Sequence, residues 1–243
     1  KEGMMVEGFD VDCPMSCYYN PSYYPLCIEK LSYTKEVDWI QYQIPANQPV
    51  PDKVHRINEM IKNKYDLRVV EGLSAKQMAK RYGAKLFDTI NEAFADLFGY
   101  VPLNEEQKKF YISQYFPFLD KRLICLVVDN NDEVVAFGVS MPSLSNALRK
   151  CKGRLFPFGW VHLLKALKNF ENIDLYLNGV KPQWQNKGIH SIYYAEMNKQ
   201  YIKLGSKMAI ANPQLETNQA VNIWEKYDSR IAIRRRAYIK TIE

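Results

Sequence analysis

The sequence predicts an α/β fold built on a sheet of mixed direction. Two β-rich runs, 123–128 and 134–139, are joined by the turn-forming residues 129–132, which indicates a β-hairpin. Further along, strand-like runs alternate with helical runs, a pattern typical of strand–helix–strand units. The 243 residues suit one large domain, or one domain with a smaller piece. With 47% hydrophobic and 25% charged residues, the composition is that of a globular protein.

The first elements are separated by a Pro-rich boundary. Residues 37–44 alternate like a strand, and the Pro-rich segment 46–51 follows them. After it, Val54, Ile57 and Ile61 recur at helical spacing. We therefore expect three parts: an N-terminal extension over 1–48, a linker helix over 49–65 and the main domain over 66–243.

The main domain is expected to open with a short strand over 66–70 and two helices. Apolar residues from Met78 to Leu97 form one helical stripe, and Gly99 ends it. Asn104 and Gln107 have the spacing of a capping box, so a second helix is expected to begin there and to end near Pro117. The hairpin follows, with Gly138 a candidate β-bulge.

The last part of the chain alternates between helix and strand. The elements expected are a helix carrying Trp160 and Leu164, a strand over 173–180, a helix over 188–204, a strand over 207–211, a helix over 218–227 and a strand over 231–242. The insert 142–172 is rich in Lys, Arg and aromatic residues. It is where acceptor contacts or a dimer surface would be sought, although plain packing explains it as well.

The junction between the 173–180 strand and the following helix is a candidate anion site. A short polar loop, 181–187, leads into the helix at Gly188. The first N–H groups of a helix have no partner within it and lie at the positive end of its dipole, so they bind phosphate groups well. Gly188 lets backbone and ligand approach closely, and Lys187 adds positive charge. Many strand-to-helix turns share these features, so this evidence alone does not fix a ligand.

Two motifs resemble the GNAT acyltransferase superfamily. The run Gln185–His190 is similar to its Gln/Arg-x-x-Gly-x-Gly/Ala signature, and 216–227 is similar to its last helix. The resemblance implies a mostly antiparallel GNAT-type sheet flanked by helices, with a V-shaped splay between the 173–180 and 207–211 strands. It also implies that acetyl-CoA or another acyl-CoA binds at Leu177, Asn178, Gly179, Val180, Gln185, Asn186, Lys187, Gly188, Ile189, His190 and Asn218.

The sequence departs from that family at two places that matter for chemistry. His190 occupies the last signature position, where Gly or Ala is usual, and Trp224 stands where the family often has a Tyr that protonates the leaving thiolate. Trp has no acidic proton to give at neutral pH. Tyr227, one helical turn later, is the candidate acid instead, and Glu216 is the candidate base. A packing role for the Tyr and a capping role for the Glu are the plainer alternatives.

The N-terminal segment echoes the C-terminal one. The Glu29-Lys30 pair with a later Tyr42 has the same offsets as Glu225-Lys226 with Tyr238. If this half-repeat is real, residues 1–48 are the tail of a preceding GNAT-like unit. Tandem units of this kind also occur in Fem-type transferases, which use aminoacyl-tRNA, and the Arg-rich 230–236 segment would then contact tRNA.

Three functions are therefore carried forward. The first is acyl-CoA-dependent transfer of an acyl group to a small-molecule or peptide amine. The second is Fem-type aminoacyl transfer, the only one in which nucleic acid is a partner. The third is a CoA-binding or interaction module without turnover.

The sequence also predicts the protein's location, the redox state of its cysteines and whether it binds a membrane or a metal. It has no apolar run that could span a bilayer and no signal-peptide pattern, so a cytoplasmic protein without a membrane partner is expected. The odd number of cysteines, five, favours reduced thiols. Cys13, Cys17 and Cys27 lack a nearby fourth ligand, so no metal site is expected.

Overall fold

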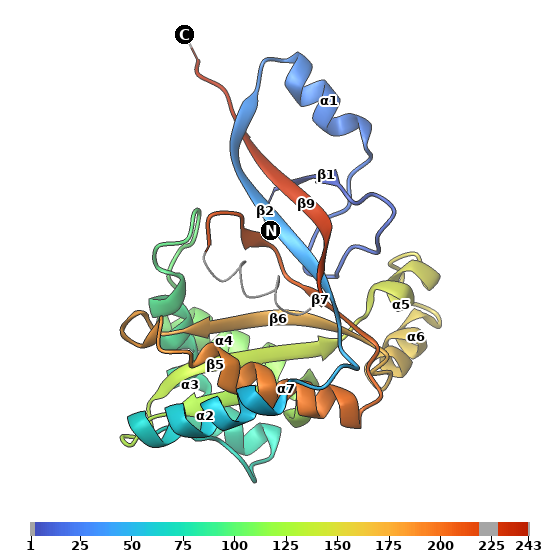
Figure 1. The fold of residues 1–243 in the computed structure, drawn as a ribbon. Helices are drawn as coiled ribbons and strands as arrows, with labels where there is room; N and C mark the ends of the chain where they lie inside the picture. Colours follow the sequence, from blue (N-terminus) through green and yellow to red (C-terminus); the bar gives the residue numbers. More distant parts are fainter. Residues whose placement is uncertain (1–2, 219–227, 243) are drawn as a thin grey trace. The chain divides into compact units, whose positions relative to one another are not determined.

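The computed structural model describes residues 3–218 and 228–242, and these divide into two compact units (Figure 1). The first unit combines the N-terminal segment through Ala46 with Pro142–Asp174 and the chain from Ser206 onward. The second combines Asn47–Met141 with Leu175–Gly205. The chain passes between the units four times, after Ala46, Met141, Asp174 and Gly205. No helix of the described residues is long and apolar enough to cross a bilayer.

The second unit is a sheet covered by helices on both faces. Its strands are β3 (Arg68–Val69), β4 (Ile124–Val128), β5 (Val134–Pro142) and most of β6 (Asn172–Val180), and its α-helices are α2 (Asp52–Tyr65), α3 (Ala75–Phe94), α4 (Glu105–Tyr115) and α7 (His190–Lys203). The pairs β3/β4 and β4/β5 are antiparallel. Every residue of β4 and β5 is buried, as expected when helices cover both faces of a sheet.

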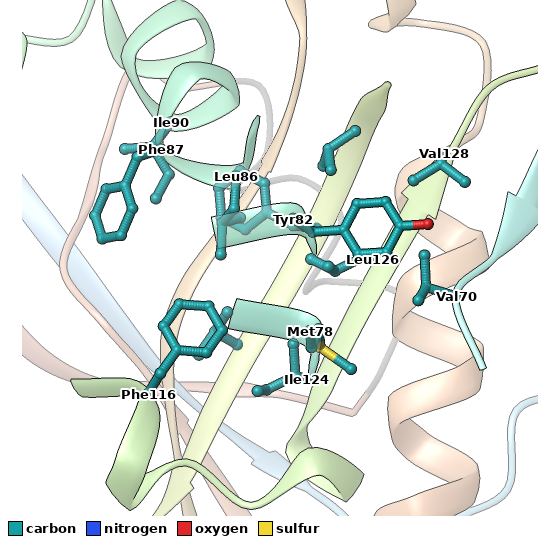
Figure 2. Close-up of a cluster of buried hydrophobic side chains, with 13 residues drawn as sticks. Val70, Met78, Tyr82, Leu86, Phe87, Ile90, Phe116, Ile124, Leu126 and Val128 are labelled. Atoms are coloured by element: carbon teal, nitrogen blue, oxygen red, sulfur yellow. The ribbon is translucent and has the colours of Figure 1, made fainter. Parts of the chain in front are cut away.

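Alternation along β4 sends side chains to two different cores. Ile124, Leu126 and Val128 point toward α3 and pack with Tyr82, as Figure 2 shows. Val127, from the opposite face, packs with apolar residues of α7 and α2. Period-two alternation in a strand produces this division directly. Between β4 and α4 lie two short 3-10 turns, η1 (Phe116–Phe118) and η2 (Lys121–Leu123).

Both helices on the α3–α4 side begin with capping boxes. The predicted box at Asn104 and Gln107 is confirmed, and Ser74 with Gln77 forms a second one at the start of α3. In each box the side chain of the first residue accepts a backbone N–H that would otherwise have no partner. The expectation of a bulge at Gly138 was wrong. This residue pairs regularly with Cys125, and a Cβ at Gly138 would lie 2.3 Å from the sulfur of Met197, so Gly138 allows α7 to pack closely on β5.

The first unit is built on a long antiparallel pair. β2 (Thr34–Pro45) pairs along most of its length with β9 (Arg230–Ile239), while β1 (Met4–Glu7) flanks β9 and β7 (Met208–Ala211) flanks β2. The two-residue β8 (Gln214–Leu215) also pairs with β2. The helices are α1 (Tyr23–Lys30), α5 (Ser145–Lys150) and α6 (Gly159–Ala166). The V-shaped opening between the β6 and β7 strands stays a prediction.

Candidate functional site

The loop between β6 and α7 is held in place by contacts on both sides of it. The backbone N–H of Lys181 donates to the carbonyl of Val135 (2.9 Å), which fixes the chain as it leaves β6. A 3-10 turn, η3 (Pro182–Trp184), follows, and the side-chain amide of Gln185 donates back to the Val180 carbonyl (3.2 Å). Ile189 is 1% exposed and belongs to the core shared with α2. The loop is therefore a defined turn with a buried anchor at its end.

Four consecutive backbone N–H groups in this loop make no well-formed hydrogen bond to another described residue. They belong to Asn186, Lys187, Gly188 and Ile189. Asn186 (φ +59°) and Gly188 (φ +78°) lie in the left-handed region on either side of Lys187. Left-handed residues between ordinary ones turn successive N–H groups toward a common concavity that binds anions. The loop also lies at the N-terminus of the 14-residue α7, where the helix dipole favours negative charge.

The first turn of α7 is clamped by a polar residue of α2. The side-chain amide of Asn58 donates to the Ser191 carbonyl (3.0 Å), and the Ser191 hydroxyl donates to the carbonyl of Gly188 (2.7 Å). Asn58 is only 4% exposed, so these bonds lie in a nearly dry environment. They satisfy the carbonyl groups of Ser191 and Gly188 and fix the start of α7 against α2.

Gly188 is required for a reason that differs from the one the sequence suggested. A Cβ at this position would lie 2.8 Å from Cδ1 of Ile61 in α2. The positive φ of Gly188 is also unfavourable for any residue with a side chain. The glycine is therefore required chiefly for the left-handed turn, because the contact is with the flexible end of the Ile61 side chain and is easily relieved.

The charge of Lys187 is fixed near the loop by aromatic rings. Its Nζ lies 4.7 Å from the centre of the Trp184 ring and 5.3 Å from that of Tyr65, and the two rings meet edge to face. Such cation–π contacts hold an ammonium group in one place without neutralising it. His190 begins α7 and is partly buried. Leu177 is exposed, and Asn178, Gly179 and Val180 are partly buried at the end of β6.

The predicted base lies in the first unit, within a cluster of charges. Glu216 forms ion pairs with Lys35 and, at 3.4 Å, with Arg234. Its backbone N–H donates to the carbonyl of Asp38 (3.0 Å), and the Asp38 side chain is bound by Lys35, Arg234 and Arg236. Glu216 is thus a member of an ion-pair network. Asn218 follows it, and its N–H donates to the Leu215 carbonyl; Tyr227 lies outside the described residues.

Sequence reasoning missed a second carboxylate of interest. Asp174 on β6 is 1% exposed, and neither of its carboxylate oxygens has a well-formed hydrogen bond to a described residue, although the Ser143 hydroxyl lies close enough to favour the ionised form. Burial raises the pKa of Asp174 to about 6, which is in the range suited to a general base at neutral pH. The available signal was a single acidic residue in the apolar run Ile173–Leu177. The described residues contain no group of three or more His, Cys, Asp or Glu that could hold a metal ion.

Comparison with solved structures identifies the fold. A GCN5-related N-acetyltransferase from Sphaerobacter thermophilus superposes with a TM-score of 0.58 at 12% identity, covering 90% of this chain and 56% of that one. A GCN5-related glucosamine N-acetyltransferase region of a fungal multi-domain enzyme gives a TM-score of 0.54 at 11% identity, covering 88% of this chain and 22% of that one. The chain has a GNAT-type fold. The turn that carries the unpartnered N–H groups is the segment that resembles the signature of that superfamily.

Two curated proteins are similar in sequence. The bacterial ceramide synthase of Caulobacter vibrioides is 25% identical over 193 residues, and protein YghO of Escherichia coli is 26% identical over 199 residues. These matches cover 75% and 76% of this chain and 47% of each relative. The chain therefore spans about half the length of the curated relatives it matches. No family model matches the sequence.

Proposed function

We propose that this chain is an acyl-CoA-dependent N-acyltransferase whose acceptor is a long-chain amine. The observation that supports it best is the run of unpartnered N–H groups from Asn186 to Ile189, on a GNAT-type fold and beside the fixed charge of Lys187. A pyrophosphate group would supply the acceptors that these donors lack. The long-chain acceptor is suggested by the relative named bacterial ceramide synthase, since a ceramide is the amide of a long-chain amino alcohol.

The proposed transfer is direct. The amine nitrogen attacks the thioester carbonyl, a C–N bond forms as the C–S bond breaks, one proton leaves the nitrogen and one reaches the thiolate of CoA. Holding both reactants in line supplies much of the acceleration. Asp174 and Glu216 are the described carboxylates proposed to take the first proton, and Tyr227 is proposed to supply the second.

Binding is tested by titrating acetyl-CoA and a long-chain acyl-CoA into the protein by calorimetry. A micromolar Kd corresponds to about −8 kcal/mol. Lys187→Glu should weaken binding at least about tenfold, because it places a negative charge beside the phosphates. Lys64→Glu is the matched control, since Lys64 lies over the same Tyr65 ring (5.1 Å) but outside the loop. A folded wild-type protein that binds neither CoA species contradicts the proposal.

Turnover is tested by mass spectrometry of the N-acylated product, with long-chain amines compared against polyamines and amino acids. Asp174→Asn and Glu216→Gln then separate the two proposed bases. If Asp174 accepts the proton, its replacement removes a limb near pH 6 from the profile of kcat/KM, and Glu216→Gln keeps that limb. The reverse result assigns the role to Glu216.

The arginines of β9 favour this function over Fem-type transfer. Arg234 and Arg236 are ion-paired with Asp38, and Arg230 donates to the side chain of Gln43. The guanidinium of Arg235 is buried and donates to Gln41 and other partners within its own unit. These side chains stabilise the β2–β9 pair and are already engaged. Steep loss of tRNA binding with salt would restore the alternative.

A further inference from the structure

The α5–α6 hairpin carries an exposed apolar patch. Leu155, Phe156, Phe158, Trp160 and Leu164 expose 47%, 83%, 72%, 47% and 51% of their surface. All seven residues from Lys152 to Phe158 are exposed. Exposed apolar side chains gathered in one short segment mark an interaction site more often than scattered single residues do.

The loop that presents the patch is ordered by its own hydrogen bonds. The backbone N–H of Trp160 donates to the Leu155 carbonyl (3.0 Å), and its indole N–H donates to the carbonyl of Pro157 (3.0 Å). Gly159 allows the chain to close on itself, because a Cβ there would lie 1.8 Å from the carbonyl oxygen of Arg154. The aromatic side chains are therefore held outward by a built turn.

The same hairpin is the source of the chain's net positive charge. Residues 143–170 contain six Lys or Arg and no Asp or Glu, while the whole chain has a formal net charge of +6. Outside this segment acidic and basic residues are equal in number. Arg149 is paired with Asp12. The other five basic residues of the segment form no ion pair with any described residue: Lys150, Lys152, Arg154, Lys165 and Lys168.

A small cavity between α5 and α6 is also lined by basic and polar side chains. Its volume is about 190 Å³, and its polar lining includes Lys150, Lys165, His162, Asn146 and Asn169. Cations and amide donors around a small cavity suit a phosphate group. The cavity is formed by α5 and α6, the two helices that flank the exposed loop 152–158, here called the aromatic loop.

We propose that the α5–α6 hairpin docks on an anionic phospholipid membrane surface, with the aromatic loop in the interface and a lipid phosphate in the α5–α6 cavity. Aromatic side chains and basic residues side by side are the combination that binds such interfaces. An acidic protein partner would pair with the lysines. It would also need a separate apolar surface to cover the exposed aromatic side chains. This differs from the sequence-based expectation of a protein without a membrane partner, which depended on the absence of a spanning segment; docking on a membrane surface requires no such segment.

The test is co-sedimentation with phosphatidylcholine vesicles prepared with and without phosphatidylglycerol, at low and high salt and without acyl-CoA. It does not rest on the proposed transfer reaction, so either idea can fail alone. Wild-type protein should bind only the vesicles that contain phosphatidylglycerol, and more weakly at high salt. Phe156→Ser with Phe158→Ser should weaken binding at least about tenfold through lost apolar burial. Lys150→Gln with Lys165→Gln should weaken it about 25-fold, since each lost charge near the surface costs about fivefold.

Control variants change residues of the same types that are also exposed, in the second unit. Phe110→Ser with Phe118→Ser and Lys80→Gln with Lys203→Gln should bind vesicles like wild type, and circular dichroism checks that every variant is folded. Wild-type protein that stays in the supernatant with anionic vesicles at low salt overturns the proposal. So does equal loss of binding in the controls. Loss of self-association in the Phe156/Phe158 variant, with no vesicle binding by wild type, would assign the patch to a second copy of the chain.

Discussion

Replacing Asp174 by Asn should raise the free energy of unfolding at neutral pH, although the residue is 1% exposed and lies within a strand. The reason is that the wild-type protein buries an ionised carboxylate with no well-formed hydrogen bond from a described residue, and the nearby Ser143 hydroxyl offsets only part of the cost of burial. Taking a charge out of water without a partner is costly. An amide of nearly the same shape removes the charge and keeps the packing.

The magnitude follows from the pKa. Burial raises the pKa of Asp174 from 3.8 to about 6, and each pKa unit corresponds to about 1.4 kcal/mol. The folded protein therefore loses about 3 kcal/mol of stability as the pH rises from about 4 to about 6, and nothing further above that. The Asn amide also lacks partners, so the gain from Asp174→Asn should be nearer 2 kcal/mol, or about 4–8 °C in Tm. Below pH 4, where the wild-type carboxyl is protonated, Asp174→Asn should be about 1 kcal/mol less stable than wild type, because only the cost of the unpartnered amide remains.

Urea unfolding followed by circular dichroism at several pH values between 4 and 8 measures this difference. Asp38→Asn is the matched control, because Asp38 is also 1% exposed but is paired with Lys35 and Arg236. Burial opposes its ionisation, yet the bonds from Arg236 and Lys35 more than compensate and lower the pKa of Asp38. Its contribution is present above its unfolded pKa and is lost at lower pH. Asp38→Asn should therefore cost about 3–5 kcal/mol at neutral pH.

The reasoning about Asp174 is refuted if Asp174→Asn is less stable than wild type at pH 7.5. It is equally refuted if the two proteins differ by the same amount at every pH, because the charge would then have no part in the difference. A variant that gains stability but loses turnover would fit a carboxylate kept at a cost to stability for its chemistry.

Three further predictions concern single residues. Gly188→Ala should cost about 1–2 kcal/mol through its positive φ, and the cost should stay similar in an Ile61→Ala background, because the contact with the flexible end of Ile61 is easily relieved; urea unfolding of the four proteins checks this. A thiol reagent should modify Cys27 first, with that phase missing in Cys27→Ser, whereas Cys125, which is buried and whose pKa burial raises, should react only after denaturation. Thr89→Val should cost about 1–2 kcal/mol in unfolding experiments, because the buried Thr89 hydroxyl donates to the Val134 carbonyl (2.8 Å).

Elements whose signals are local in sequence could be predicted. The α3 stripe, the capping box at Asn104, the hairpin around Asp132 and the helix that begins near Gly188 all appear, with ends shifted by a few residues. Each depends on spacing or on a turn residue that acts within a few positions.

Elements that depend on distant partners could not be predicted. β1 is four residues long and exists because it pairs with β9 at the other end of the chain. β8 has two residues and is defined by its pairing with β2. α1, in the Tyr-rich segment, has little apolar periodicity and contacts β1. In each case the neighbour in space supplies what the local sequence lacks.

In the candidate site, some features also depend on local sequence and others on distant partners. This explains why the cofactor residues were easier to predict than the acid–base residues. A phosphate loop is made of backbone N–H groups, so its requirements are a turn, a glycine and a helix start, all within Gln185–His190. A base is defined by its surroundings. Glu216 differs from an ordinary exposed Glu because Lys35 and Arg234 reach it from β2 and β9. Asp174 differs from an ordinary Asp because it is buried without a charged partner among the described residues. The neighbouring sequence indicates neither the ion pairs of Glu216 nor the burial of Asp174. For this fold, the acid–base chemistry therefore has to be assigned from paired variants such as Asp174→Asn and Glu216→Gln.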